Sequence, residues 1–165
     1  LIPLYMNFSE NSRVWVYQAN RNLAPEELNA IQERLDAFTA SWEAHGKVLK
    51  AAAAIQYNRF IIFMVDEAQA SVTGCSIDKS VAVLKTIEQE FNLSLFDRMQ
   101  LAYRNEHGIQ VCSKATFETL IATGLVTEDT VVFNNLAQTY EALKTAWEVP
   151  AKHSWHSTLF TKTSA

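Results

Sequence analysis

The sequence is poor in the residues that build specialised binding loops, with four glycines and two cysteines among 165 residues. The phosphate-cradling pattern G-x-x-x-x-G-K-[ST] is absent, because Ser41 stands where the glycine ahead of Gly46 would be needed. The patterns G-x-G-x-x-G, G-x-S-x-G, H-E-x-x-H and C-x-x-C do not occur either. These absences predict a chain without a bound nucleotide, cofactor or metal.

Runs of one kind of residue are also missing. No two Lys or Arg residues are adjacent and the net charge is −4, which excludes the basic stripe of a nucleic-acid-binding protein. No apolar run approaches the roughly 18 residues that a membrane span needs. Cys75 and Cys112 fit neither a disulfide framework nor a zinc spacing, so we expect a reduced, cytoplasmic setting.

The composition is that of an ordinary globular protein, with 48% apolar and 19% charged residues. Neither an internal repeat nor a linker divides the chain, so residues 1–165 are expected to form one domain.

The first half alternates strand and helix patterns. A helix opens at Pro25, and its apolar stripe continues to Trp42, with His45 in the last turn and Gly46 as the left-handed stop. A second helix is expected from about Lys79, with Asp78 as its N-cap. The strands predicted in this half are Arg13–Gln18, Val48–Tyr57 and Phe60–Val65.

The second half begins with a predicted hairpin of Asp97–Arg104 and Ile109–Cys112. Ser113 can cap a short helix that ends at Gly124. A short strand over Thr130–Phe133, a helix capped by Asn134 or Asn135 with an apolar stripe to Trp147, and a packed tail with Trp155 complete the pattern.

This order predicts an α+β domain with a largely antiparallel sheet and helices mainly on one face. The first six elements match the ferredoxin-like order. A three-layer α/β fold is the alternative.

A two-residue turn at Asn58-Arg59 would place Tyr57 opposite Phe60 and Lys50 opposite Glu67. Asp66 would then lie on the more apolar face, which is unusual for a carboxylate. The same arrangement gathers further candidate residues at this end of the sheet: Trp42, His45, Cys75 and Asp78.

Each candidate also has a plain structural interpretation. His45 and Asp78 suit helix ends, Cys75 suits a small buried position, and Asp66 suits a loop cap. The two histidines of His153-Ser-Trp-His156 lack a nearby acidic or cysteine partner, which favours a packed tail over a metal site.

One set of segments is distributed over most of the chain: Val14–Arg21, Trp42–Gly46, Tyr57–Ile62, Val65–Glu67, Gly74–Asp78, Phe133–Asn135 and Ser154–His156. These segments resemble a family of short, functionally uncharacterised bacterial proteins that are often labelled "ABC transporter ATPase". The resemblance implies no established activity, and without a Walker A loop Val65-Asp66-Glu67 gives the ATPase label no support.

Three functions are compatible with this pattern. The first is a non-catalytic module that binds a small molecule or a protein in a pocket formed by Trp42, Asp66, Cys75, Asp78 and Trp155. The second is a structural protein whose aromatic residues pack against another copy in a homo-oligomer.

The third function is a thiol-dependent enzyme. Cys75 would be its nucleophile and His45 its base, with Asp66 or Asp78 orienting the imidazole.

Overall fold

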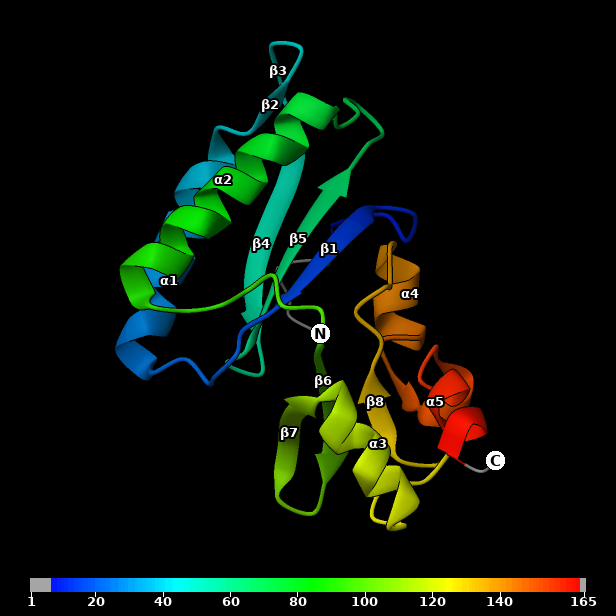
Figure 1. The fold of residues 1–165 in the computed structure, drawn as a ribbon. Helices are drawn as coiled ribbons and strands as arrows, with labels where there is room; N and C mark the ends of the chain where they lie inside the picture. The colour runs from blue at the N-terminus through cyan, green and yellow to red at the C-terminus, as the bar shows by residue number, and fades with distance from the viewer. Residues whose placement is uncertain (1–6, 164–165) are drawn as a thin grey trace.

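A computed structural model describes the backbone of residues 7–163 and the side chains of residues 7–161. The first half forms a three-stranded antiparallel sheet in the order β1-β5-β4, with two long helices on one face (Figure 1). Its elements are β1 (Arg13–Gln18), α1 (Pro25–Ala40), the hairpin β2 (Glu43–Ala44) and β3 (Lys47–Val48), β4 (Lys50–Gln56), β5 (Phe60–Asp66) and α2 (Gly74–Phe91).

The second half forms a four-stranded sheet in the order β7-β6-β8-β9, with short helices around it (Figure 1). The α+β prediction is therefore confirmed. The elements of the second half are β6 (Gln100–Asn105), β7 (Gly108–Ser113), α3 (Lys114–Ala122), β8 (Val131–Phe133), α4 (Tyr140–Thr145), β9 (Glu148–Pro150), the 3-10 turn η2 (Ala151–His153) and α5 (Ser157–Thr163).

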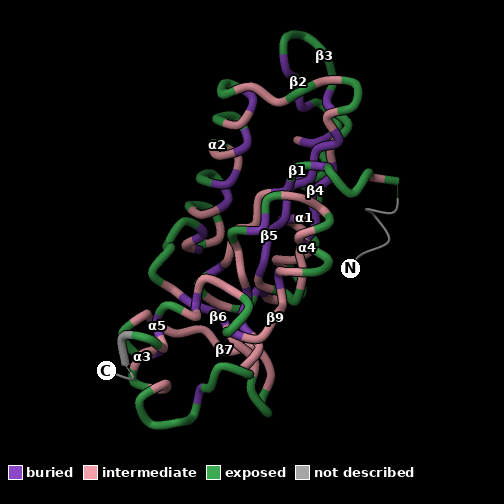
Figure 2. The backbone as a smooth tube through the Cα atoms, turned by 90° about the vertical axis from the view of Figure 1, so that its right-hand side faces the viewer, coloured by how far each residue is buried: buried purple, intermediate pink, exposed green. Residues whose placement is uncertain are grey.

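The central strand β5 is buried along its whole length, as its continuous apolar sequence predicts (Figure 2). Phe63 and its face pack against α1, α2 and Trp42, which gives a helix-side core. The opposite face, with Phe60, packs against Phe133 and Trp147 of the second half, which gives a shared core. The two sheets are thus joined by buried apolar contacts.

The ferredoxin-like arrangement is only partly present. β1 and β4 both run antiparallel to β5, which lies between them, as in a split β-α-β unit. The sixth element, β6, does not complete this sheet but pairs with β7 and β8 in the second sheet. Leu101 and Ala102 of β6 are buried in two different clusters, so this strand is the centre of its own sheet.

The predicted end of the first helix is wrong. The helix ends at Ala40, and Trp42 turns inward, where its indole Nε1 donates to the backbone oxygen of Ser76 at 2.8 Å. His45 and Gly46, with φ of 52° and 76°, form the two-residue turn between β2 and β3. A left-handed glycine ends helices and closes hairpins alike, and the sequence pattern did not separate the two uses.

The predicted register of the β4–β5 hairpin is wrong by one residue. The turn has three residues, and Tyr57 and Asn58 both take a left-handed conformation, with φ of 55° and 57°. Gln56 therefore lies opposite Phe60, and Lys50 lies opposite Asp66. A shift of one residue exchanges the two faces of β4, so Asp66 shares its face with Ala52 and Ala54 and not with Ala51 and Ala53, as the predicted register would have it.

Two of the predicted helix caps are also wrong. Thr73 caps α2, accepting from the Ser76 amide at 3.1 Å, and Asp78 lies exposed within the helix. Thr139 caps α4 at the same distance in place of Asn134 or Asn135. The prediction that Ser113 caps α3 is confirmed.

Candidate functional site

Asp66 lies at the end of β5 and is held by structural contacts. Its carboxylate accepts from the Ala68 amide at 3.1 Å and the Ser9 amide at 3.4 Å, and pairs with Lys50 at 3.6 Å. The Ala68 amide is the largest cause that lowers the pKa of Asp66. The carboxylate is therefore explained as a loop cap and ion-pair partner.

The other predicted site residues do not join it. Trp42 packs on Phe63 at 5.7 Å between ring centroids, on the face of the sheet opposite to Asp66. Cys75 is exposed in the first turn of α2, and His45 is exposed at the tip of the β2–β3 hairpin. No hydrogen bond or ion pair described for residues 7–161 links His45, Cys75, Asp66 or Asp78 to one another. The predicted pocket is therefore not assembled.

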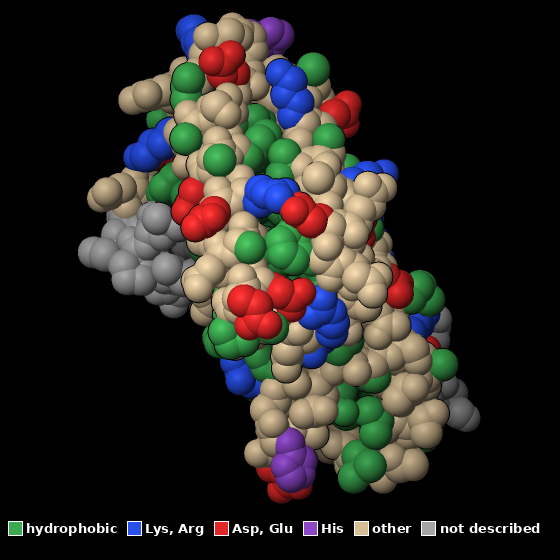
Figure 3. Space-filling model, turned by 90° about the vertical axis from the view of Figure 1, so that its left-hand side faces the viewer, with side chains coloured by type: hydrophobic (Ala, Val, Ile, Leu, Met, Phe, Trp, Pro, Cys, Tyr) green, Lys and Arg blue, Asp and Glu red, His purple; other side chains and the backbone are tan. Residues whose placement is uncertain are grey.

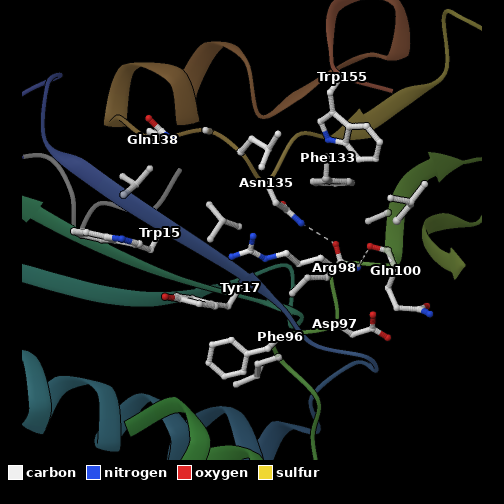
Figure 4. A pocket seen from close by; sticks show the side chains of 18 residues that line it. Trp15, Tyr17, Phe96, Asp97, Arg98, Gln100, Phe133, Asn135, Gln138 and Trp155 are labelled. Carbon is white, nitrogen blue, oxygen red and sulfur yellow. Dashed lines mark hydrogen bonds between the residues drawn. The ribbon is translucent and has the colours of Figure 1, made fainter. Parts of the chain in front are cut away.

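A different cavity lies along the outer edge of β1, with a volume of about 510 Å³ (Figure 4). All of β1 except Arg13 lines it, together with the loop before β6, the start of β6 and the loop between β8 and α4. Of the five predicted binding residues, Trp155 is the one that lines this cleft. The residues of this β1 cleft are Val14–Gln18, Leu95–Arg98, Gln100–Ala102, Phe133, Asn135–Gln138 and Trp155.

The backbone of β1 is open toward the cleft. The Val14 amide points outward, since it donates to the backbone oxygen of Gln138 at 3.0 Å, and Arg13 forms an antiparallel bridge with Thr139. Backbone groups alternate in direction along a strand, so the amide and carbonyl of Val16 point outward too. Neither group has a hydrogen-bond partner within residues 7–163.

A polar side-chain network closes one end of the cleft. The indole of Trp147 donates to Asn135 Oδ1 at 2.9 Å, and the Asn135 amide donates to Gln18 Oε1 at 3.0 Å. Gln18 in turn donates to the backbone oxygen of Gln100 at 3.5 Å (Figure 4). This network ties the end of β1 to the second half of the chain.

Arg98 supplies an uncommitted positive charge. Its side chain reaches into the cleft between Tyr17 and Asn135, and it is exposed (Figure 4). Within the described side chains it makes no hydrogen bond and no ion pair. Burial raises the pKa of Tyr17, and the positive charge of Arg98 opposes that rise. The neighbouring Asp97 carboxylate is exposed, and its Oδ1 accepts from the Met99 amide at 2.9 Å.

The rim of the cleft exposes apolar side chains. Phe96 and Leu136, which line it, are 36% and 65% exposed. Exposed apolar side chains at a cavity offer contact surface to a ligand. The rim therefore marks the same place as the cavity.

The face covered by α1 and α2 is charged. Acidic and basic side chains are mixed over it (Figure 3), and they form ion pairs such as Arg34 with Glu90 and Arg21 with Glu27. Among the described residues, no group of three potential metal ligands occurs. Nor does any described helix combine the length and apolar content needed to cross a bilayer.

No protein-family model matches the chain, and neither a curated protein nor a solved structure matches it significantly. The site therefore has to be interpreted from its own geometry.

The cleft was not predicted from the sequence because it depends on β6 pairing within the second sheet and not beside β1 in the first. One local signal was present. Asp97 lies two residues before Met99 and accepts from its amide, an Asx turn that the strand prediction for 97–104 overlooked. Recognition of this turn would have predicted that Arg98 lies in a loop and not in a strand.

Proposed function

We propose that the protein is a non-catalytic binding module whose ligand site is the β1 cleft. The observation that carries this proposal is the unpaired guanidinium of Arg98 within a cavity of about 510 Å³. Ligand sites commonly have volumes of about 300–1,000 Å³, with mostly apolar walls and a few polar groups that orient the ligand. The β1 cleft has this composition.

The charge of the site indicates the kind of ligand. Within the described side chains Arg98 has no partner, so it can form a charge-assisted hydrogen bond with an anionic ligand. Asp97 keeps its negative charge, and one of its oxygens accepts from the Met99 amide. Tyr17 and Trp155 provide aromatic surface within the same cleft. We infer a ligand that carries a carboxylate or another anionic group next to an apolar portion.

The two cysteines support a proposal about the cellular compartment of the protein. Both thiols are free: Cys75 is exposed and Cys112 is half-buried. An exposed free thiol is more compatible with a reducing compartment than with an oxidising one, so we propose a cytoplasmic location.

The binding proposal can be tested with N-acetyl-L-glutamate, an N-capped amino acid that offers two carboxylates and an amide. In two-dimensional NMR spectra we expect saturable shifts of the Trp15 and Trp155 indole signals, and weaker shifts with N-acetyl-L-lysine amide. The variant Arg98→Gln should lose the response. The matched control Arg34→Gln removes an arginine on α1 that pairs with Glu90 and should keep it.

The proposal fails if none of these compounds shifts the two indole signals. It also fails if Arg98→Gln and Arg34→Gln respond alike, because the binding would then not depend on the charge in the cleft.

A further inference from the structure

The first sheet lacks the strand that its topology would place beside β1. In a complete ferredoxin-like sheet, the last strand of the β-α-β-β-α-β order pairs antiparallel with the first. Here that strand, β6, belongs to the second sheet, and the outer edge of β1 lines a cavity instead. A fourth strand could therefore pair with the outer edge of β1, and no strand from residues 13–113 occupies this position.

We propose that the ligand of the β1 cleft is an extended acidic peptide segment of a partner protein, which adds to β1 as an antiparallel strand. This inference rests on the proposed binding function and specifies the ligand class. Addition of a strand to an exposed sheet edge is a recurrent mode of peptide recognition, in which backbone hydrogen bonds give affinity and alternate side chains give specificity.

The hydrogen-bonding groups for such a strand are in place. From Val14 to Gln18 the outward groups are the Val14 carbonyl, both groups of Val16 and the Gln18 amide, and none has a partner within residues 7–163. The bridge between Arg13 and Thr139 is antiparallel and already begins a ladder on this edge. Gln138 already occupies the position opposite Val14, so the open edge consists of the four residues Trp15–Gln18, or roughly 13 Å.

The two sides of the cleft differ in character. Val14 and Val16 belong to the shared core, with Phe133 on the same side. Trp15 and Tyr17 point to the other side. There the rings of Tyr17 and Phe96 pack edge to face with 5.4 Å between their centroids, and the positive charge of Arg98 acts on the Tyr17 hydroxyl. A bound strand alternates its side chains between these sides, so we expect alternating apolar and acidic residues.

The test uses the capped pentapeptide Ac-Val-Glu-Val-Glu-Val-NH2, whose central valine would lie opposite Val16 in a directly hydrogen-bonded pair. Its lysine counterpart Ac-Val-Lys-Val-Lys-Val-NH2 is the charge control. We expect the glutamate peptide to bind at least about 10-fold more tightly in titrations followed by NMR, and Arg98→Gln to remove most of that difference.

Backbone methylation tests the strand geometry. N-methylation of the central valine removes the hydrogen bond to the Val16 carbonyl and should weaken binding by about 10-fold. N-methylation of either glutamate affects an amide that points away from β1 and should change affinity by less than about threefold. Equal effects at the central and flanking positions would overturn the inference.

Two protein variants probe the second hydrogen bond of the same residue pair, in which the Val16 amide donates to the carbonyl of the central valine. Val16→Pro removes an amide that takes no part in pairing with β5, a substitution that sheet edges tolerate, and it should weaken binding by about 10-fold. Val16→Ala keeps the amide and removes only apolar contact, so it should weaken binding less than Val16→Pro does. The methylated peptides keep the test decisive if Val16→Pro does not fold.

The outcomes separate this inference from the function on which it rests. If N-acetyl-L-glutamate binds in an Arg98-dependent way and the peptide adds nothing, the peptide inference fails and the binding function stands. If neither binds, both fail. A stable dimer whose β1 edges are paired would also overturn the inference, because a second copy would occupy the strand position.

Discussion

The buried imidazole of His156 makes the stability of the protein depend on pH between about 4 and 6.5. The residue is 1% exposed, its ring stacks on Trp155 with 3.9 Å between centroids, and Ser154 Oγ bonds its Nδ1. Its Nε2 has no hydrogen-bond partner within the described residues. Burial lowers the pKa of His156 from 6.5 to about 4.

The sign of the effect follows from which state binds the proton. Between the two pKa values the unfolded chain holds a proton that the folded chain does not, so acidification favours unfolding. A difference of about 2.5 pKa units corresponds to about 3 kcal/mol, and most of it should be lost on going from pH 7 to pH 4.5. The loss begins below pH 6.5 and levels off below pH 4.

Urea denaturation at pH 7 and pH 4.5 measures this loss. We expect His156→Phe to reduce the difference between the two pH values by about 2–3 kcal/mol relative to the wild type. The exposed neighbour provides the control, and His153→Gln should change the difference much less than His156→Phe does. Equal pH dependence in the wild type and His156→Phe would refute the reasoning.

Three further predictions concern other parts of the structure. Tyr57→Phe, which removes the hydroxyl bonded to Glu148 but keeps the ring beside Trp147, should lower the free energy of unfolding by about 1 kcal/mol in urea titrations; no loss would mean that this bond contributes nothing. Asp66→Asn should cost about 1–2 kcal/mol at pH 7, and, because the folded pKa is lowered from 3.8, the difference from wild type should shrink as the pH falls below 3.8. In the folded protein, Ellman's reagent should modify the exposed Cys75 well before Cys112, whose thiol pKa is raised by burial; equal rates would contradict the described burial.

Much of the fold follows from local sequence signals. The boundaries of β1 match the predicted strand, and Pro25 opens α1 as expected of proline in the first turn. The continuous apolar sequence of β5 correctly predicted a central, fully buried strand. In these segments, propensity, periodicity and tertiary burial all favour the same structure.

The errors arose where one residue pattern serves two structures. His45-Gly46 closes a hairpin instead of a helix, and the turn after β4 uses left-handed Tyr57 and Asn58, conformations that non-glycine residues rarely adopt. The ring of Tyr57 stacks with Trp147, and its hydroxyl bonds Glu148, so contacts distant in sequence hold this turn. Local patterns do not contain that information.

The candidate site was missed for a related reason. Its cleft depends on the sheet that β6 joins, which is decided by the pairing of β6 with β7 and β8 and by the burial of Leu101 and Ala102. The predicted convergence on Asp66 depended on a hairpin register that is shifted by one residue in the structure. Strand pairing therefore explains both the wrong prediction of a site at Asp66 and the actual position of the cleft.

Amide hydrogen exchange along β1 tests the open strand edge most directly. In the free protein we expect slow exchange at Trp15 and Tyr17, which pair with Phe63 and Ile61 of β5, and fast exchange at Val16, whose amide points into the cleft. Addition of Ac-Val-Glu-Val-Glu-Val-NH2 should slow Val16 by about 10-fold or more at saturation and leave Trp15 unchanged. Exchange at Val16 as slow as at Trp15 in the free protein would contradict the account, because the edge of β1 would then already be covered.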